Sequence, residues 1–308
     1  MDAMRRSVAW TPAPETALDP DPTGRAAELT AFLTGRRSVA LTGAGLSTPS
    51  GIPDYRSPGS PPRTPMTIDM FLSSPEFRRH YWARNHLGWR HMDATSPNAA
   101  HRALARLEDD GLISGILTQN VDMLHLKAGS RRVLDLHGSY GRVICLDCGH
   151  TLSRHVLDAA LEAANPGFRD RVTGRGAIEV APDADAVLED TAGFATVDCP
   201  QCGGILKPDI VYFGENVPRT AVARAFAMVD DADAVLVVGS SLTVMSGLRF
   251  VRHAARAGKP VAILNRGATR GDELAHLKID HRCETILPAV AAALGPEPVN
   301  SASQSGIA

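Results

Sequence analysis

The sequence predicts an α/β protein built on a doubly wound, Rossmann-like parallel sheet, with a smaller inserted module and a helical and loop insertion. Short apolar runs end in Gly, Ser or Asn, and segments with helical periodicity separate them. Because the runs are short and continuously apolar, we expect strands that are buried on both faces. Strands that alternate with helices indicate a parallel sheet whose ligand site lies at the carboxyl ends of the strands. The runs occupy residues 38–45, 113–120, 132–139, 233–241 and 260–267.

Helices are expected between these strands. One follows a Ser-Pro start at residue 96 and ends before Gly111. A second follows Pro218, and its apolar residues recur at i, i+3, i+4 and i+7 up to residue 229. A third covers about residues 247–257 and stops at a Gly-Lys-Pro sequence. A fourth, at about 153–164, lies between the paired cysteines described below.

We expect the chain to divide into one larger domain and two insertions. Residues 1–25 and 293–308 have no apolar period, which is typical of disordered or flexible tails. Residues 57–94 form a Pro-rich loop followed by an aromatic, basic segment, and residues 141–204 contain the paired cysteines. These two insertions are expected to form a second, smaller module. The Rossmann-like domain then comprises residues 26–56, 95–140 and 205–292.

The composition excludes several classes of protein. Hydrophobic residues make up 44% and charged residues 21% of the 308, so a disordered or fibrous chain is disfavoured. The 32 Lys and Arg residues nearly balance the 34 Asp and Glu residues, so no overall charge favours nucleic acid or an anionic membrane as a partner. No run of about 18 apolar residues occurs, and residues 1–22 lack the apolar segment of a signal peptide. We therefore expect a cytoplasmic protein.

A glycine-rich turn follows the first predicted strand. Residues 41–47 have the sequence LTGAGLS, whose glycines let backbone amides approach a phosphate closely. The spacing differs from GxGxxG and from the Lys-bearing P-loop, so it predicts neither simple hydride transfer nor NTP hydrolysis. For this segment on its own, a tight strand-to-helix turn without a ligand is the alternative.

Polar side chains follow three of the predicted strands. Residues 50–57 (SGIPDYRS) come just past the glycine turn, residues 118–122 (TQNVD) end a second strand, and residues 136–139 (LHGS) end a third. Because the carboxyl ends of parallel strands meet at one edge, we expect these side chains to converge on a ligand. Next to these polar segments, His137 is suited to proton transfer, whereas a histidine on its own is more often structural.

Four of the five cysteines form two CxxC pairs, Cys145 with Cys148 and Cys199 with Cys202. This is the knuckle spacing of a Cys₄ zinc site, and glycines follow each pair. Redox pairs and buried free thiols are the alternatives. Four thiolates would fill the coordination shell of zinc, so we expect one structural Zn²⁺ rather than a catalytic one.

Seven separated motifs together resemble the sirtuins, the family of NAD-dependent protein-lysine deacylases. In chain order they are GAGLSTPSGIPDYRS, TQNVDMLH, LHGS, the two CxxC pairs, LKPDIVYFGE, VGSSL and ILNRG, and the resemblance covers about residues 26–290. The sequences PDYR, YWARNHLGW and CLDCGH and the long segment between the cysteine pairs look like the class II branch. That branch includes the mitochondrial sirtuin linked to lipoamidase, ADP-ribosyltransferase and branched acidic deacylase activities.

The resemblance implies NAD as co-substrate and assigns its contacts. Gly43, Ala44, Gly45 and Ser47 would contact the diphosphate. The loop over nicotinamide would contain Asp54, Tyr55 and Arg56, and the nicotinamide ribose and carboxamide would be held by Gln119, Asn120 and Asp122. The adenosine side would be lined by Gly239, Ser240, Ser241, Asn265, Arg266, Gly267 and Cys283.

The implied mechanism begins with attack of the acyl-lysine carbonyl oxygen on C1′ of the nicotinamide ribose. Nicotinamide leaves, and an imidate-linked intermediate forms. His137 then removes a proton from the ribose diol so that a hydroxyl group can attack the imidate carbon, and Asn120 is the second residue placed in the catalytic set. Hydrolysis yields free lysine and O-acyl-ADP-ribose.

The resemblance also implies that acylated-lysine proteins bind as extended peptides between the two modules, by strand addition. One binding edge would be the segment after Ser241, and the other would comprise Val211, Tyr212, Phe213, Gly214 and Glu215. For residues 211–215 on their own, a buried strand and turn is the alternative.

A helical Tyr-x-x-Arg sequence bears on the choice of acyl group. Tyr81 and Arg84 would share one helix face, and they resemble the Tyr and Arg that desuccinylating sirtuins use. We therefore hypothesise a preference for acidic acyl groups such as glutaryl, bound by charge-assisted hydrogen bonds. The alternative is that Arg84 pairs with a structural carboxylate.

Two other functions fit the same residues. A protein mono-ADP-ribosyltransferase could use the same NAD contacts with a protein nucleophile. A non-catalytic, NAD-sensing zinc protein would bind NAD without releasing nicotinamide. A conventional dehydrogenase is disfavoured, because the glycine spacing differs and no site for a hydride acceptor is evident.

Overall fold

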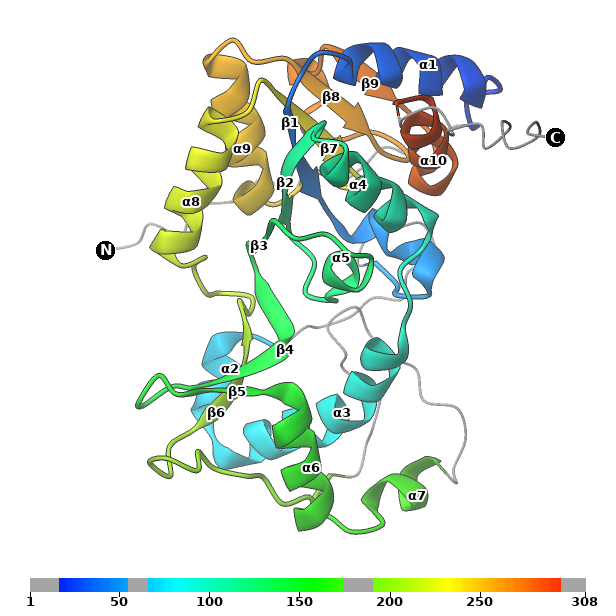
Figure 1. Ribbon diagram of the computed structural model, residues 1–308. Helices are drawn as coiled ribbons and strands as arrows, with labels where there is room; N and C mark the ends of the chain where they lie inside the picture. The colour runs from blue at the N-terminus through cyan, green and yellow to red at the C-terminus, as the bar shows by residue number, and fades with distance from the viewer. Residues whose placement is uncertain (1–16, 55–65, 174–190, 295–308) are drawn as a thin grey trace, which may run out of the picture.

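The computed structural model describes residues 17–54, 66–173 and 191–294, and it has two lobes (Figure 1). The larger lobe contains a six-stranded sheet in the order β3-β2-β1-β7-β8-β9, and every neighbouring pair is parallel. This confirms the predicted fold class. The strands are β1 (Ser38–Thr42), β2 (Ile113–Thr118), β3 (Val133–Asp135), β7 (Ala234–Val238), β8 (Val261–Leu264) and β9 (Leu277–Ile279).

All five predicted strands are present, but each ends before its apolar run does. Beyond four of these strand ends the residues turn away from the sheet as loops, whereas beyond β3 residues 136–137 form a turn and a strand of the smaller lobe begins at Gly138. These segments carry the site described below. The edge strand β9 is not among the predicted strands, because only three residues take part in it.

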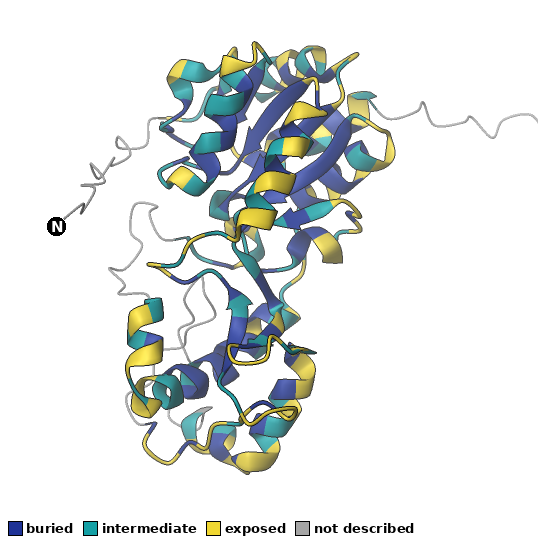
Figure 2. Ribbon diagram, turned by 90° about the vertical axis from the view of Figure 1, so that its left-hand side faces the viewer, coloured by how far each residue is buried: buried dark blue, intermediate teal, exposed yellow. Residues whose placement is uncertain are grey.

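Helices cover both faces of the sheet (Figure 1). The side chain of Ala40 in β1 packs with one group of helices, and its neighbours Val39 and Leu41 pack with the other. Figure 2 shows the strands of this sheet as almost entirely buried. One face carries α1 (Pro22–Leu33), α4 (Ala99–Asp109) and α10 (Cys283–Leu294), and the other carries α8 (Arg219–Asp230) and α9 (Met245–Arg256).

Helix α1 corrects the predicted amino-terminal tail, because it begins at Pro22, inside the range 1–25. The Asp21 side chain accepts a hydrogen bond from the Gly24 backbone N–H at 2.8 Å, which caps the helix. Leu29 and Leu33 are fully buried, so the first helix anchors this end of the chain to the sheet.

The smaller lobe is built on a three-stranded antiparallel sheet in the order β5-β4-β6. Both predicted insertions contribute to one apolar core, which includes Phe71, Trp89, Val143 and Leu157. Its elements are β4 (Gly138–Cys145), β5 (Thr151–Ser153), β6 (Leu206–Ile210), α2 (Ile68–Ser73), α3 (Pro75–Ala94), α6 (Arg154–Ala164) and α7 (Phe168–Thr173).

The boundaries of this lobe differ from the predicted range of 141–204. Strand β6 lies in the range assigned to the Rossmann-like domain, yet Lys207 in β6 pairs with Ile144 in β4. The pairing places β6 in the small sheet, so the segment that contains the cysteines enters the smaller lobe at about residue 138 and leaves it at about residue 211.

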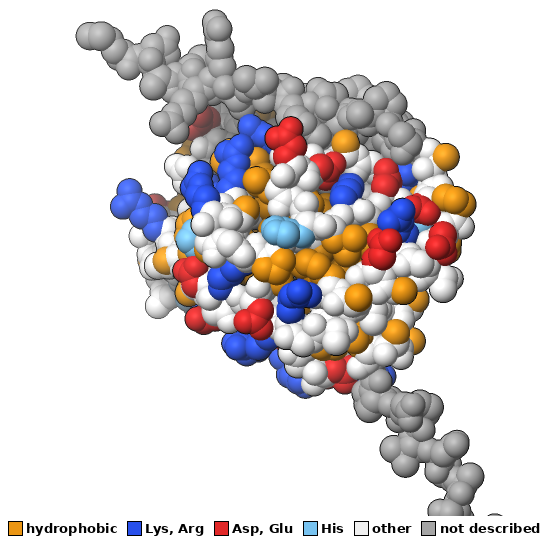
Figure 3. All heavy atoms as spheres, turned by 90° about the horizontal axis from the view of Figure 1, so that it is seen from above, with side chains coloured by type: hydrophobic (Ala, Val, Ile, Leu, Met, Phe, Trp, Pro, Cys, Tyr) orange, Lys and Arg blue, Asp and Glu red, His pale blue; other side chains and the backbone are white. Residues whose placement is uncertain are grey.

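Acidic and basic side chains are interspersed on the face of the larger lobe that Figure 3 shows. Within the described ranges, no helix combines the length and the apolar character needed to cross a membrane.

Candidate active site

A cleft of about 1230 Å³ runs along the carboxyl ends of β1, β2, β7 and β8 and reaches the end of β6 in the smaller lobe. Every predicted NAD, catalytic and peptide residue within the described ranges lines this cleft. Tyr55 and Arg56 lie outside the described residues. The lining includes Gly43, Ala44, Gly45, Ser47, Asp54, Gln119, Asn120, Asp122, His137, Val211, Tyr212, Phe213, Gly214, Glu215, Gly239, Ser240, Ser241, Asn265, Arg266, Gly267 and Cys283.

Three glycines bring the turn after β1 against the loop after β7. The turn continues into short 3₁₀ helices, η1 (Ala44–Leu46) and η2 (Thr48–Ser50). A Cβ atom on Gly43 would lie 2.7 Å from the Ser240 Cβ atom, and one on Gly45 would lie 3.0 Å from the Gly239 carbonyl oxygen. Gly239 has a φ of +60°, and a Cβ atom there would lie 2.3 Å from the Leu46 nitrogen. The two loops therefore form a cradle of backbone groups that suits the close approach of a diphosphate.

Ser47 connects two of the predicted ribose contacts. Its hydroxyl group donates to Oδ2 of Asp122 at 2.6 Å and accepts from Nδ2 of Asn120 at 3.1 Å. Nδ2 of Asn120 also donates to the Gly43 carbonyl oxygen at 3.1 Å. Burial raises the pKa of Asp122, although the hydrogen bonds from Ser47 and from the Leu124 backbone oppose that effect. These bonds fix the Asn120 amide and the Asp122 carboxylate against the glycine turn.

Two buried histidines lie close to the same turn. His125, in the short helix α5 (Leu124–Lys127), has its Nε2 atom 2.9 Å from the Thr42 hydroxyl oxygen. The His101 ring lies 5.1 Å from the His125 ring, between their centres. Burial lowers the pKa of His101 to about 4 and that of His125 to about 3, so both rings are neutral at pH 7.

His137 follows β3 and has a partner at each ring nitrogen. Nδ1 lies 2.7 Å from the Gln119 carbonyl oxygen, and Nε2 lies 2.8 Å from the Ser246 hydroxyl oxygen. Burial lowers the pKa of His137, the hydrogen bond to Gln119 opposes this, and the positive charge of Arg249 adds to the lowering. The imidazole is therefore neutral at pH 7 and able to accept a proton. Ser246 and Arg249 both line the cleft, and no motif in the sequence pointed to either residue.

The far side of the cleft is built at the ends of β8 and β9. Nδ2 of Asn265 donates to the Arg266 carbonyl oxygen at 2.7 Å, and Asp280 accepts from Arg266 and from the Gly267 backbone N–H. Burial raises the pKa of the Cys283 thiol to about 12. The thiol is therefore an unreactive part of the wall.

The predicted peptide edge is held by an ion pair between a buried lysine and a half-buried glutamate. The Val211 backbone N–H donates to the His137 carbonyl oxygen at 2.8 Å, and the Tyr212 N–H donates to Oε2 of Glu215 at 2.6 Å. The same carboxylate oxygen lies 3.1 Å from Nζ of Lys207, which is almost fully buried. Lys207 is a residue that the sequence analysis missed, because a lysine within a strand gives no signal of its partner.

Tyr81 and Arg84 do not belong to the described lining of the cleft. The Tyr81 side chain is buried among Phe71, Trp82 and Tyr212, and its hydroxyl oxygen lies 3.2 Å from that of Tyr140. A guanidinium nitrogen of Arg84 lies 2.9 Å from Nε2 of His80. These positions give no support to the hypothesis of a carboxylate-binding pair.

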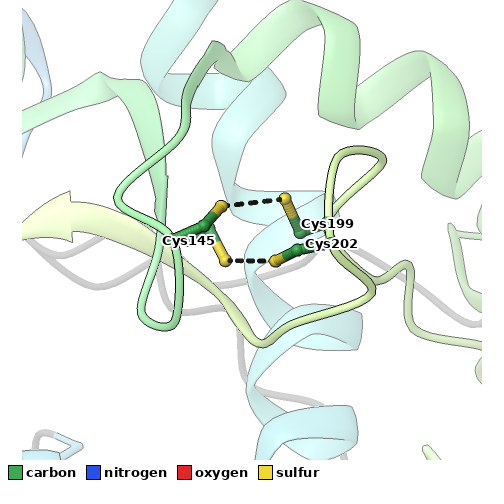
Figure 4. A group of neighbouring side chains, drawn as sticks. Cys145, Cys199 and Cys202 are labelled. Carbon is green, nitrogen blue, oxygen red and sulfur yellow. Dashed lines mark hydrogen bonds between the residues drawn. The ribbon is translucent and has the colours of Figure 1, made fainter.

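The four paired cysteines come together at the end of β4 and in the loop before β6. Their sulfur atoms all lie within 4.8 Å of one another, and Figure 4 shows three of them pointing toward a common centre. Cys145 and Cys202 are 3.5 Å apart, and Cys148 and Cys199 are 3.8 Å apart. A tetrahedral zinc site with Zn–S bonds of about 2.3 Å places its sulfurs about 3.8 Å apart.

The electrostatics of the thiols also suit a cation. The Cys148 backbone N–H lowers the pKa of the Cys145 thiol to about 7, whereas hydrogen bonding with Cys148 raises that of Cys202 to about 12. Four thiolates this close repel one another unless a cation lies between them. The donor set and spacing fit one structural Zn²⁺ at the end of β4, whereas His137 directly precedes the start of that strand.

Comparison with known proteins identifies the family. Residues 43–246 match the family model described as Sir2 family. The chain belongs to the Sir2 family. The protein named NAD-dependent protein deacetylase 1 of Mycobacterium avium (strain 104) is 62% identical to this Sir2 protein over 273 residues, which is 89% of this chain and 97% of the relative. A protein of the same name from Streptomyces coelicolor (strain ATCC BAA-471 / A3(2) / M145) is 50% identical over 296 residues, covering 95% of this chain and 96% of the relative.

Solved structures of other Sir2 proteins share the fold. A structure of Sir2 with a p53 peptide and NAD⁺ has a TM-score of 0.68 and 32% identity to this chain, and the match covers 86% of this chain and 97% of that chain. One of Sir2 bound to an acetylated peptide has a TM-score of 0.68 and 30% identity, covering 87% of this chain and 97% of that chain. The predicted family is thus confirmed. The comparisons name no branch within it.

Proposed function

We propose that this Sir2-family protein is an NAD-dependent protein-lysine deacylase that releases nicotinamide and O-acyl-ADP-ribose. The observation that carries the proposal is the position of His137, a neutral imidazole in the same cleft as the glycine cradle. The backbone carbonyl oxygen of His137 accepts a hydrogen bond from the backbone N–H of Val211, the first residue of the proposed peptide edge. The base, the nucleotide cradle and the peptide edge therefore meet at one place.

The residues divide the work of the reaction. The backbone groups around Gly43 and Gly239 would hold the diphosphate, and Asn120 and Asp122 would orient the nicotinamide ribose. His137 would accept a proton from a ribose hydroxyl group, after the acyl oxygen has displaced nicotinamide. NAD supplies the electrophilic C1′ carbon and the leaving group for this chemistry.

Acylated-lysine proteins are the proposed partners, bound as extended segments along residues 211–215. The Lys207–Glu215 ion pair fixes the Tyr212 backbone, so the edge is ready to form main-chain hydrogen bonds.

The cleft beside this edge is lined by Met66, Ile210 and Tyr212. We propose that this apolar wall accepts acetyl or another uncharged acyl group in preference to an acidic one. We propose the cytoplasm as the location of the protein, because cysteine pairs that bind a metal instead of forming disulfides suit a reducing compartment.

The experiment incubates the purified protein with NAD and one peptide carrying acetyl, succinyl, glutaryl, hydroxymethylglutaryl, lipoyl or myristoyl lysine. Mass spectrometry measures nicotinamide, deacylated peptide and O-acyl-ADP-ribose. We expect equal amounts of the three products with the acetyl peptide and slower turnover with the acidic acyl groups. If NAD were consumed while ADP-ribose became attached to protein, the activity would be mono-ADP-ribosyl transfer. NAD binding without nicotinamide release would indicate a sensor.

The Arg84→Met variant, assayed on the same peptides, separates the two readings of the Tyr-x-x-Arg sequence. Because Arg84 is outside the described lining of the cleft, we expect the ranking of acyl groups to stay the same. A selective loss of succinyl and glutaryl turnover would restore the carboxylate-binding hypothesis.

A further inference from the structure

Helix α9 brings a hydroxyl group to the proposed base. Ser246 is the second residue of the helix, and its Oγ atom lies 2.8 Å from Nε2 of His137. The two residues are 109 positions apart in the chain. Both line the cleft, so the contact lies where the substrate hydroxyl groups would bind.

The hydrogen bond at the other ring nitrogen fixes the direction of this one. Nδ1 of His137 lies 2.7 Å from the Gln119 carbonyl oxygen, which can only accept, so Nδ1 carries the proton. A neutral imidazole with a proton on Nδ1 has a lone pair on Nε2. The Ser246 hydroxyl group therefore donates to Nε2, the atom that has to accept the proton of the ribose hydroxyl.

We propose that Ser246 is a positioning residue for His137: its hydroxyl group holds the ring in one orientation and keeps Nε2 unprotonated until a substrate hydroxyl group replaces it there. This inference rests on the proposed deacylase function, in which His137 is the base. A hydrogen bond that donates to a neutral nitrogen stabilises the unprotonated form. It also satisfies Nε2, a half-buried acceptor that would otherwise lack this partner in the resting cleft.

The start of α9 is fitted closely to this part of the cleft. A Cβ atom on Gly247 would lie 2.7 Å from Oε1 of Gln119, so the helix approaches the residue whose carbonyl group holds Nδ1. Nε2 of Gln119 donates to the Ser240 hydroxyl group at 2.7 Å. Ser246 and Gln119 thus hold the two sides of the imidazole ring. Of the charged groups in the described ranges, Arg249, also on α9, is the one whose charge lowers the pKa of His137.

The test is an NMR titration of His137 in the full chain without NAD, so it does not depend on the deacylase activity. In the wild-type protein, the ¹⁵N shifts should show a protonated Nδ1 and an unprotonated Nε2 at pH 8. In Ser246→Ala we expect the His137 pKa to rise by about 0.5 to 1 pH unit, the equivalent of one net hydrogen bond. Ser246→Thr, which keeps a hydroxyl group, should restore the wild-type value.

The acid limb of the pH profile for kcat/KM should move to higher pH by the same amount in Ser246→Ala, because kcat/KM reports the free enzyme, in which Ser246 still contacts Nε2. The loss at the plateau of this profile should be less than about tenfold. Arg249→Met is the comparison variant, in which the His137 pKa should also rise. That rise should shrink with added salt, whereas the rise in Ser246→Ala should not. A proton on Nε2 in the wild-type protein, or an unchanged His137 titration in Ser246→Ala, would overturn the inference. A loss of more than about 100-fold at every pH would also overturn it, because Ser246 would then lie on the proton path. An inactive wild-type protein would refute the deacylase function alone.

Discussion

The two buried histidines next to the glycine turn predict how the stability of this Sir2 protein depends on pH. An unfolded histidine has a pKa near 6.5, whereas burial lowers that of His101 to about 4 and that of His125 to about 3. The folded state therefore favours the neutral form. The stability that this contributes is fully present above pH 6.5 and is lost as the pH falls toward the folded values.

The size of the loss follows from these pKa values. Between pH 7 and pH 5 the unfolded side chain becomes protonated while the folded one stays neutral. Each histidine then costs about 2 kcal/mol of the free energy of unfolding. Two of them cost about 4 kcal/mol, a large part of a typical total of about 5–15 kcal/mol.

The His125→Leu variant isolates one of these contributions. Leucine keeps the site apolar, although the Thr42 hydroxyl group loses a partner, so some stability should be lost equally at every pH. The loss between pH 7 and pH 5 should be about 2 kcal/mol smaller than in the wild-type protein. Urea unfolding followed by circular dichroism at pH 7, 6 and 5 measures this difference. His91→Gln is the control, because His91 is exposed, and it should leave the loss unchanged. An equal loss in His125→Leu and wild type would refute the reasoning.

Three further predictions concern the cleft and the metal site. His137→Ala should reduce turnover by about 10²–10⁴-fold while zinc content and the circular dichroism spectrum stay unchanged, and full activity would remove this residue from the role of base. Gly43→Ala should raise the KM for NAD at least about tenfold, because the added Cβ atom would lie 2.7 Å from the Ser240 Cβ atom. Gly193→Ala is the control, because nothing lies within 4 Å of the new Cβ atom. Equal effects of the two substitutions on the KM for NAD would contradict the proposal that the glycine cradle binds NAD. Removal of zinc by a chelator, or Cys148→Ser, should make the smaller lobe sensitive to proteases and abolish peptide turnover, and a zinc-free protein with normal turnover would show that the metal is dispensable.

The sequence predicted the larger sheet well, because alternating strands and helices leave few possible arrangements. The sequence also placed separate motifs at one edge of the sheet. One residue from each of four motifs, Gly43, Asn120, His137 and Gly239, does line the cleft. This works because the carboxyl ends of parallel strands must meet. The cysteine pairs were predictable for a similar reason, since their spacing alone fits a zinc knuckle.

Pairings between distant side chains could not be predicted in this way. Ser246 meets His137 because helix α9 packs against the sheet, and Lys207 meets Glu215 because the chain turns after β6. The i, i+3 spacing of Tyr81 and Arg84 predicts a shared helix face but not what that face packs against. Packing of the small lobe buries Tyr81 among aromatic rings instead of exposing it to the cleft.

The most direct test follows one oxygen atom through the reaction. A peptide with ¹⁸O in the carbonyl group of acetyl-lysine is incubated with NAD and the wild-type protein in unlabelled water, and the products are fragmented in a mass spectrometer. If the acyl oxygen attacks C1′ in this cleft, the label will appear in the ADP-ribose part of O-acetyl-ADP-ribose, with one nicotinamide released per peptide. An unlabelled ADP-ribose part, or deacetylation without nicotinamide release, would contradict the account.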